Sequence, residues 1–354
     1  FLKGFAVTVW DLPDFDDHEG VHFFRDRSAG LTAVIAVHST TLGPAAGGVR
    51  FWHYPEAAAA VTDALRLSRG MSYKNAMAGL PLGGGKGVIL ADSAGSKTPS
   101  LIAAFGRAVE SLSGRYVTAE DVGMSSEDMV TISRETRHVS GMPVARGNAG
   151  GDPGPYTAYG VYLGVKAAVK RALGKDDVAG VHVAIQGVGS VGGGLARLLA
   201  ADGAVLTLAD VNDGRARALA DELGAKAVAA DEILRVEADV ISPNALGAIL
   251  TEESIAALRA PIVAGGANNQ LATPADGDRI HARGILYAPE CVINAGGIIN
   301  VGLEYVGRGD EADVRERISH IPERLEQVWA ESATTGDPAA RVADRIAQRL
   351  ISRG

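Results

Sequence analysis

The chain has 354 residues, 47% of them hydrophobic and 21% charged, with a formal net charge of -8. This length and composition predict about two domains with full hydrophobic cores, and the acidic balance argues against nucleic-acid binding. Its single cysteine, Cys291, excludes an internal disulfide, and we find neither a membrane-spanning apolar run nor a signal peptide, so we expect a cytoplasmic protein. The eight histidines show no metal-ligand spacing, and we expect no metal.

Strands and helices alternate through the first part of the chain. In order, the predicted elements are strands over 21–25 and 31–38, a helix over 55–70, a strand over 88–90, a helix over 98–112, a short strand from 116 and a helix from 126. Residues 141–155 are rich in Gly and Pro, which indicates a loop and a domain boundary or hinge.

Lys86 follows three consecutive glycines in a predicted loop. Glycine allows positive φ and a close approach to a ligand, so a lysine there suggests a charge directed into a cleft. A phosphate-binding P-loop is excluded, because Leu80 stands where its first glycine is required and Gly87 follows the lysine. A glycine-rich turn with an exposed lysine remains the simpler alternative. Together with Lys74 and Asp121, however, Lys86 suits the binding and deprotonation of a small carboxylate substrate.

The second part of the chain predicts a doubly wound parallel sheet. After a helix over 157–173, its elements are a strand over 181–185, a helix carrying leucines 195, 198 and 199, a strand over 204–209, short strands from 240, 262 and 285, and a final amphipathic helix around 342–351. Such a sheet binds ligands at the carboxyl ends of its strands.

A Gly-x-Gly-x-x-Gly motif, Gly187 to Gly192, lies between the first strand and helix of this sheet, and Asp210 ends the next strand. This context is the dinucleotide-binding fingerprint, in which Gly187 forms the turn, Gly189 admits the pyrophosphate and Gly192 allows close helix packing. A plain strand-to-helix turn is the alternative. Asp210 can accept hydrogen bonds from ribose hydroxyls and repels a 2′-phosphate, which favours NAD over NADP.

Together these motifs resemble the family of amino acid dehydrogenases that act on leucine, valine, phenylalanine and glutamate. The matching stretches are residues 40–48, 69–76, 82–86, 118–123, 157–160, 186–192 and 287–297. The resemblance implies reversible, NAD-dependent oxidative deamination of an L-amino acid to a 2-oxo acid and ammonia. It also implies a substrate and oligomerisation domain over 1–145, a Rossmann NAD domain over 146–329, a cleft between them, and a last segment, 330–354, that packs on the first domain.

The resemblance also implies residue roles. Lys86 and Asp121 match the catalytic lysine and the general acid/base. Residues that match substrate positions are Lys74, Gly47, Ala46, Met71, Ala119, Asn269, Asn294, Ile298 and Val301. Residues that match cofactor positions are Gly187, Gly189, Ser190, Val191, Gly192, Asp210, Thr157, Asn244 and Asn268. A second ammonium nearby should lower the pKa of Lys86.

Three alternative functions are considered, and the chain departs from the family pattern at two positions. A glutamate dehydrogenase would require a lysine at Ala46, so we expect an apolar substrate: leucine, valine or isoleucine before phenylalanine. A phenylalanine dehydrogenase is the first alternative, and an NAD-binding sensor without catalysis is a further one. Gly154 stands where the family pattern has Ser, and Cys291 where it has an aromatic residue. The family implies a homo-oligomer, a dimer or larger, which the apolar segment Phe1 to Trp10 supports weakly.

Overall fold

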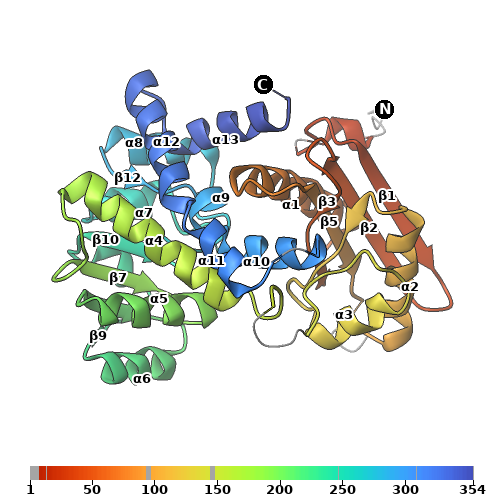
Figure 1. The fold of residues 1–354 in the computed structure, drawn as a ribbon, viewed down its shortest axis with the longest axis horizontal. Coiled ribbons are helices and arrows are strands. Elements are labelled where there is room, and N and C mark those ends of the chain that lie inside the picture. The colour runs from red at the N-terminus through yellow and green to blue at the C-terminus, as the bar shows by residue number, and fades with distance from the viewer. Residues whose placement is uncertain are drawn as a thin grey trace, which may run out of the picture. The chain divides into compact units, whose positions relative to one another are not determined.

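The computed structural model, shown in Figure 1, describes residues 8–12, 14–92, 97–143, 148–245, 247–307 and 309–353. The chain forms two compact units. Unit 1 consists of Phe1–Gly151, Val301–Asp310 and Ala347–Gly354, and unit 2 of Asp152–Asn300 and Glu311–Ile346. The predicted boundary at residue 145, and residues 1–7 of the proposed oligomerisation segment, lie outside the described residues.

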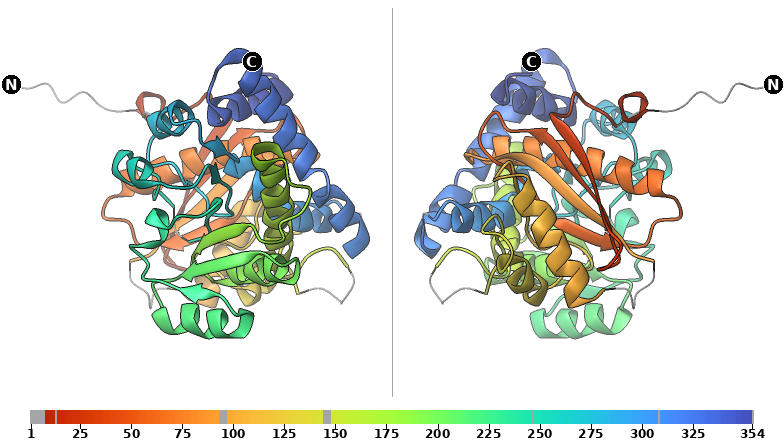
Figure 2. Two further views of the ribbon diagram at one scale, coloured as in Figure 1. Left: turned by 90° about the vertical axis from the view of Figure 1, so that its left-hand side faces the viewer. Right: turned by 90° about the vertical axis from the view of Figure 1, so that its right-hand side faces the viewer.

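Unit 1 contains a six-stranded mixed sheet in the order β1-β2-β5-β3-β6, with β4 also paired to β5. Its strands are β1 (Gly20–Asp26), β2 (Leu31–Ser39), β3 (Ala45–Ala46), β4 (Val49–Trp52), β5 (Gly83–Leu90) and β6 (Tyr116–Val117). The β1–β2 and β2–β5 pairs are antiparallel, whereas β3 and β4 lie parallel to β5. Figure 2 shows this sheet in its right-hand view.

Helices cover both faces of the unit 1 sheet (Figure 1). They are α1 (Ala57–Met77) on one face, and α2 (Pro99–Ser111) and α3 (Ser126–Ser133) on the other; a short 3-10 helix, η1 (Val9–Asp11), precedes the sheet. Successive residues of β2 point to opposite faces. Val34 and Ala36 accordingly pack with helix α1, and Ile35 and Val37 pack with α2 and α3.

The helix predicted over residues 55–70 has different bounds in the structure. Helix α1 runs on to Met77 rather than ending near residue 70, because its last turns bury Ser72, Tyr73 and Asn75 against the sheet. The helix ends before Gly79, whose φ of 65° breaks the helical geometry. Lys74 therefore lies on a helix, and not in the segment after one.

Unit 2 contains six parallel strands in the order β12-β11-β10-β7-β8-β9. These strands are β7 (His182–Gln186), β8 (Val205–Ala209), β9 (Lys226–Ala227), β10 (Val240–Pro243), β11 (Ile262–Val263) and β12 (Leu286–Tyr287). The predicted α/β class with a doubly wound sheet is confirmed. The left-hand view in Figure 2 faces this sheet.

The helices of unit 2 alternate with its strands. They are α4 (Gly154–Leu173), α5 (Ser190–Ala201), α6 (Asp213–Leu223), η3 (Ile233–Arg235), α7 (Glu252–Ala257), α8 (Pro274–Ala282), α9 (Glu290–Ile293), α11 (Glu311–Ile318) and α12 (Ile321–Thr335). Two helices, α10 (Gly296–Tyr305) and α13 (Ala339–Leu350), contribute residues to both units. The last eight residues of the chain, 347–354, belong to unit 1, whereas 311–346 belong to unit 2.

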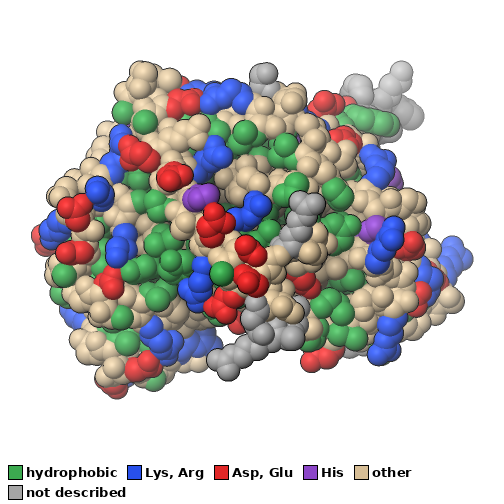
Figure 3. Space-filling model, in the orientation of Figure 1, with side chains coloured by type: hydrophobic (Ala, Val, Ile, Leu, Met, Phe, Trp, Pro, Cys, Tyr) green, Lys and Arg blue, Asp and Glu red, His purple; other side chains and the backbone are tan. Residues whose placement is uncertain are grey.

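The surface drawn in Figure 3 carries basic and acidic side chains interspersed over each unit. Within the described parts of the chain, none of the helices combines the length and the apolar character needed to cross a bilayer.

Candidate active site

A charged contact in unit 1 joins the buried Lys86 and the partly exposed Asp121. Lys86 lies in the middle of β5 and is only 5% exposed, and Asp121 follows β6. The Nζ atom of Lys86 donates a hydrogen bond to Oδ2 of Asp121 at 2.6 Å. The parallel pairing of β3 with both β5 and β6 brings these two segments to neighbouring positions. The structure thus places the two predicted catalytic side chains in direct contact.

Burial changes the acidity of both groups. It lowers the pKa of the Lys86 ammonium below its ordinary value, although the carboxylate of Asp121 opposes the change. Burial alone would raise the pKa of Asp121, but Lys86 and Arg50 together hold it below the usual range. The predicted direction for Lys86 agrees with the structure, but the leading cause is desolvation rather than a second lysine ammonium.

Arg50 is a member of this cluster that the sequence analysis did not identify. It lies on β4, and its Nε donates to Oδ2 of Asp121 at 3.2 Å. Its Nη1 donates to Oδ2 of Asp63 on helix α1 at 2.8 Å. A signal was present, because Arg50 stands two residues after the Gly47-Gly48 pair of a matching motif. Only the structure shows that its side chain reaches Asp121, 71 residues further along the chain.

The glycines before Lys86 serve packing rather than ligand approach. Lys86 lies within strand β5 and not in a loop, and none of the glycines in this strand has a positive φ. A Cβ on Gly84 would lie 2.0 Å from the backbone nitrogen of Ser72, and one on Gly83 would lie 1.9 Å from the carbonyl oxygen of Ser39. The predicted glycine-rich loop is therefore wrong: these residues allow helix α1 and neighbouring strands to contact β5 closely.

The other predicted substrate residues of unit 1 come from several elements. Lys74 lies in the last turn of helix α1 and is partly exposed. A Cβ on Gly47 would lie 3.1 Å from Cγ of Met71, so this helix contacts the chain between β3 and β4. Ala46 is 6% exposed on β3. Ala119 and Val301 are partly exposed, on the segment after β6 and on α10.

In unit 2, the three fingerprint glycines have the local geometry that a dinucleotide site requires. Gly187 has a φ of 83°, in the left-handed region that favours glycine. A Cβ on Gly192 would lie 1.9 Å from the carbonyl oxygen of Gly187, whereas a Cβ on Gly189 would meet nothing within 4 Å. The turn is therefore packed tightly against backbone at Gly192 and has open space at Gly189. It leads into helix α5, where the backbone amides of Ser190 and Val191 at the N-terminus suit an anion. The residues present fit a dinucleotide.

Asp210 follows β8 and is 7% exposed. Its Oδ2 accepts a hydrogen bond from the backbone nitrogen of Val188 at 2.9 Å, and its Oδ1 accepts one from Asn212 at 2.9 Å. Nη1 of Arg215 lies 3.7 Å from the same Oδ2. The carboxylate is therefore held rigidly beside the fingerprint turn, with one cation close to it.

Thr157 and Asn244, two of the predicted cofactor residues, form local hydrogen bonds in unit 2. Oγ1 of Thr157 donates to the carbonyl oxygen of Pro153 at 3.0 Å. Asn244 accepts from the backbone nitrogen of Gly266 at 2.9 Å and donates to Oγ of Ser242 at 2.9 Å. Both side chains are oriented by the fold, and a contact with a cofactor would have to use their remaining hydrogen-bonding capacity.

Three asparagines lie around the loop after β11. Nδ2 of Asn294 donates to Oδ1 of Asn268 at 2.8 Å, and Asn294 is 5% exposed. Oδ1 of Asn294 is buried and has no hydrogen-bond partner among the described residues. An orphan amide oxygen suits a donor such as a substrate ammonium. Asn269 has a φ of 53°, and its backbone nitrogen donates to Glu290. Ile298, on α10, is partly exposed.

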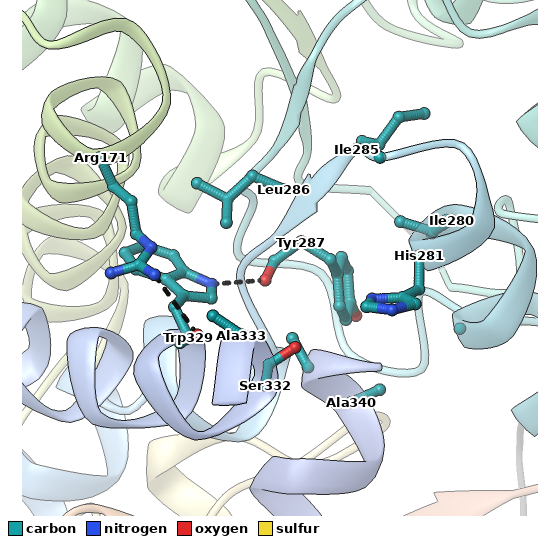
Figure 4. A pocket seen from close by; sticks show the side chains of 13 residues that line it. Arg171, Ile280, His281, Ile285, Leu286, Tyr287, Trp329, Ser332, Ala333 and Ala340 are labelled. Carbon is teal, nitrogen blue, oxygen red and sulfur yellow. Dashed lines mark hydrogen bonds between the residues drawn. The ribbon is translucent and has the colours of Figure 1, made fainter. Parts of the chain in front are cut away.

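A separate groove in unit 2 has a volume of about 230 Å³ and is shown in Figure 4. Its walls include Arg171, His281, Tyr287 and Trp329, and the indole nitrogen of Trp329 donates to the carbonyl oxygen of Tyr287 at 2.8 Å. It lies at β12, the opposite edge of the sheet from β9. The described residues that line it include none of the predicted site residues. The described residues also contain no group of three or more His, Cys, Asp or Glu suited to a metal.

Comparison with known proteins identifies the class. The model of the Glu/Leu/Phe/Val dehydrogenase dimerisation domain matches residues 18–138, and that of the Glutamate/Leucine/Phenylalanine/Valine dehydrogenase domain matches residues 208–350. The chain therefore belongs to the Glu/Leu/Phe/Val dehydrogenase family, which confirms the resemblance. Family membership and the Rossmann-type sheet imply a nicotinamide cofactor.

Individual relatives cover nearly the whole chain. Leucine dehydrogenase of Bacillus subtilis is 47% identical over 95% of this chain and 92% of its own length. Valine dehydrogenase of Streptomyces coelicolor is 44% identical over 96% of this chain and 93% of its own length. The crystal structure of L-tryptophan dehydrogenase from Nostoc punctiforme has a TM-score of 0.83 and 39% identity, covering 95% of this chain and 97% of that one. A glutamate dehydrogenase from Thermus thermophilus, at 22% identity and a TM-score of 0.77, shares the fold.

Proposed function

We propose that this chain catalyses the NAD-dependent, reversible oxidative deamination of an apolar L-amino acid to the 2-oxo acid and ammonia. The enzyme class, an oxidoreductase acting on CH–NH2, follows from the family and its leucine and valine dehydrogenase relatives. The single observation that carries the proposal is the partly buried hydrogen bond between Lys86 and Asp121. An amine with a lowered pKa in contact with a carboxylate suits proton transfer, which a protein that only bound NAD would not require.

In this proposal, four residues of the chain have distinct roles in the reaction. Lys74 holds the substrate carboxylate by charge. Lys86 polarises the water that attacks the substrate iminium and stabilises the oxygen of the resulting carbinolamine. Asp121 moves protons to and from nitrogen and oxygen. When bound, a nicotinamide dinucleotide supplies the acceptor for the hydride that leaves Cα. Asn294 offers an unpaired amide oxygen that can accept from the substrate ammonium.

The cofactor in this proposal is NAD rather than NADP. Asp210 is held in place by two backbone nitrogens beside the fingerprint turn. An ionised carboxylate accepts hydrogen bonds from both ribose hydroxyls and repels a 2′-phosphate. Arg215 on helix α6, with Nη1 3.7 Å from Asp210, reduces this repulsion only in part, because its side chain is 54% exposed and solvent screens its charge.

The preferred substrates in this proposal are leucine, valine and isoleucine. Apolar side chains at Ala46, Met71 and Ala119 would leave a charged substrate without a partner. An aromatic amino acid is the second candidate substrate. The small side chain of Ala46 favours it, and the similarity to L-tryptophan dehydrogenase supports it. A sensor that binds NAD without turnover is disfavoured, because Lys74, Lys86 and Asp121 are all present.

The direct test mixes the protein with NAD and a panel of L-amino acids and follows NADH absorbance. We expect turnover with several branched aliphatic amino acids, slower turnover with phenylalanine, and none with glutamate. The reverse reaction, with 2-oxo acid, ammonia and NADH, is the second readout. A protein that binds NAD but turns over no amino acid in either direction would contradict the proposal and support the sensor.

We also propose a homo-oligomer, a dimer or larger, built through unit 1. The match of residues 18–138 to a dimerisation domain supports it. Light scattering at micromolar concentration tests it, and a monomer would refute it.

A further inference from the structure

Asp121 accepts from two cations at the same oxygen. Nζ of Lys86 lies 2.6 Å from Oδ2, and Nε of Arg50 lies 3.2 Å from it. The two cations differ in a property that matters for proton transfer. Lys86 can lose its proton, and burial favours that loss. A guanidinium does not deprotonate in proteins, so Arg50 stays charged throughout the pH range of an enzyme.

The side chain of Arg50 is itself held in place by the carboxylate of Asp63. Its Nη1 donates to Oδ2 of Asp63 at 2.8 Å, and the hydroxyl of Tyr54 donates to the same oxygen at 2.6 Å. The side chain of Asp63 is 11% exposed and that of Arg50 is 23% exposed. Arg66, one turn along helix α1, donates to the other carboxylate oxygen of Asp63 at 3.2 Å. The guanidinium is therefore fixed by Asp63 of helix α1 through Nη1 and contacts Asp121 through Nε.

Charged and titratable groups approach the Lys86–Asp121 pair from four elements. Lys86 lies on β5 and Arg50 on β4. The charge of Asp63, on α1, acts on Lys86, and Tyr116, on β6, lies near Asp121. Arg50 lowers the pKa of both members, since a cation disfavours the Lys86 ammonium and favours the Asp121 carboxylate.

We propose that Arg50, fixed by Asp63, is a positioning residue for Asp121, which keeps that carboxylate ionised and in place while Lys86 is neutral. When Lys86 loses its proton, Asp121 loses the charge of one partner. Arg50 remains as the permanent counter-ion, so the carboxylate does not take up a proton in compensation or swing away. This inference rests on the proposed function, because it assigns Arg50 a part in the proton transfers of that reaction.

The main test replaces Arg50 with glutamine, which removes the charge and keeps a donor. We expect kcat/KM to fall roughly tenfold or more, because the carboxylate is less well positioned. The pH profile of kcat/KM reports groups of the free enzyme, and we expect both its acid and its alkaline limbs to move to higher pH. Removal of a fixed cation raises the pKa of Asp121 and of Lys86 together. The conservative variant Arg50→Lys should restore much of the limb positions, because it restores the charge.

A matched control is Arg66→Gln. It removes a different arginine from the same Asp63 carboxylate, on a side chain that is 49% exposed and does not touch Asp121. We expect its limbs to stay where the unmodified protein has them. Asp63→Asn is a second variant in case Arg50→Gln fails to fold. It removes the carboxylate that holds Nη1 of Arg50, so kcat/KM should fall. It also removes an anion that raises the pKa of Lys86, so its limbs should not move to higher pH as those of Arg50→Gln do.

A readout without substrate or cofactor separates this inference from the proposed function. The pH dependence of Lys86 acetylation by acetic anhydride, measured by peptide mass spectrometry, reports the titration of Lys86 directly. We expect it to move to higher pH in Arg50→Gln and not in Arg66→Gln. Unshifted acetylation and unshifted limbs in Arg50→Gln, whether activity is lost or retained, would overturn the positioning role. Absence of turnover in the unmodified protein would instead overturn the proposed function.

Discussion

A Cβ on Gly84 would lie 2.0 Å from the backbone nitrogen of Ser72, so strand β5 and helix α1 meet at a distance that only glycine allows. Lys86 stands two residues after Gly84, and Lys74 two residues after Ser72. Because side chains two apart on a strand share a face, Lys86 points to the side of β5 that α1 covers. The contact thus sets the spacing of the elements that carry both lysines.

Gly84→Ala should destabilise unit 1 strongly. The added methyl group meets backbone, which cannot move away as a flexible side chain can. Overpacking of a core costs about 1–3 kcal/mol, and we expect about 3 kcal/mol or more here, measured from the urea midpoint. Gly70→Ala, on the same helix, is the matched control: its Cβ meets nothing within 4 Å, and replacing a helical glycine should stabilise by about 0.5–1 kcal/mol. Equal effects of the two changes would contradict this account of the glycines.

Sequence patterns were sufficient where local rules decide the structure. The β7–turn–α5 unit with Asp210 could be predicted because glycine spacing, the flanking strand and the acid lie close together in the chain. Lys86 and Asp121 were selected from the sequence as a charged set, and the family resemblance then assigned their roles. The doubly wound sheet followed from the alternation of apolar strands with helices.

Tertiary contacts decided the features that the sequence analysis missed. The Gly83–Gly87 run has the composition of a loop, and only the contacts of α1 and the neighbouring strands make it a strand. Helix α1 extends through Ser72 because its last turns are buried. The Arg50–Asp63 pair joins a strand to a helix across 13 residues, and no local pattern marks it.

Lys86→Ala and Asp121→Asn should each reduce turnover by at least 100-fold, since in the proposed reaction Lys86 polarises the attacking water and Asp121 transfers protons. NAD binding should persist in both, because the fingerprint glycines belong to unit 2. Lys74→Ala should mainly raise KM, by losing a charge-assisted pair worth about 1.5–3 kcal/mol. Steady-state kinetics and calorimetric titration with NAD measure these effects. Near-normal turnover in either of the first two variants would show that the roles are misassigned.

Asp210→Asn should relax the cofactor preference. The amide keeps the size of the side chain and an acceptor for a backbone nitrogen, but it removes the charge that repels a 2′-phosphate. Arg215, at 3.7 Å, then becomes available to the phosphate. We expect the NADP/NAD ratio of kcat/KM to rise at least tenfold. Arg215→Ala added to this variant should reverse part of the gain. A preference for NADP in the unmodified protein would contradict the prediction.

Gly154→Ser should weaken NAD binding. A Cβ at Gly154 would lie 2.0 Å from Oγ of Ser190, the first residue of helix α5. Ser190 must leave its present rotamer, at a cost of about 0.5–1.5 kcal/mol, which corresponds to a severalfold increase in Kd. Ser190→Ala in the same protein removes the nearer clashing atom and should recover affinity. If Gly154→Ser alone leaves the Kd for NAD unchanged, then the departure from the family pattern at this position has no consequence for the cofactor.

The substrate preference should be graded rather than absolute, because one methylene in an apolar pocket discriminates by only about 1–3 kcal/mol. Ala119 adds a methyl group where a glycine would leave room for a ring, and Ile298 is β-branched and stiff. In the pocket proposed from the family resemblance, both residues would favour leucine, valine and isoleucine over phenylalanine. Ala46 acts in the opposite direction, since it is small and buried on β3.

The ratio of kcat/KM for leucine and phenylalanine decides between these effects. We expect leucine to exceed phenylalanine, because in the proposed pocket Ala119 and Ile298 both reduce the space for a ring and only Ala46 enlarges it. Ala46→Leu should then increase the ratio further, and Ala119→Gly should lower it, each within the range of about 1–3 kcal/mol for a small change in an apolar pocket. A highest kcat/KM for phenylalanine or tryptophan would show instead that Ala46 dominates. In that case Ala46→Leu should shift the preference back toward leucine, which tests the same residue from the opposite starting point.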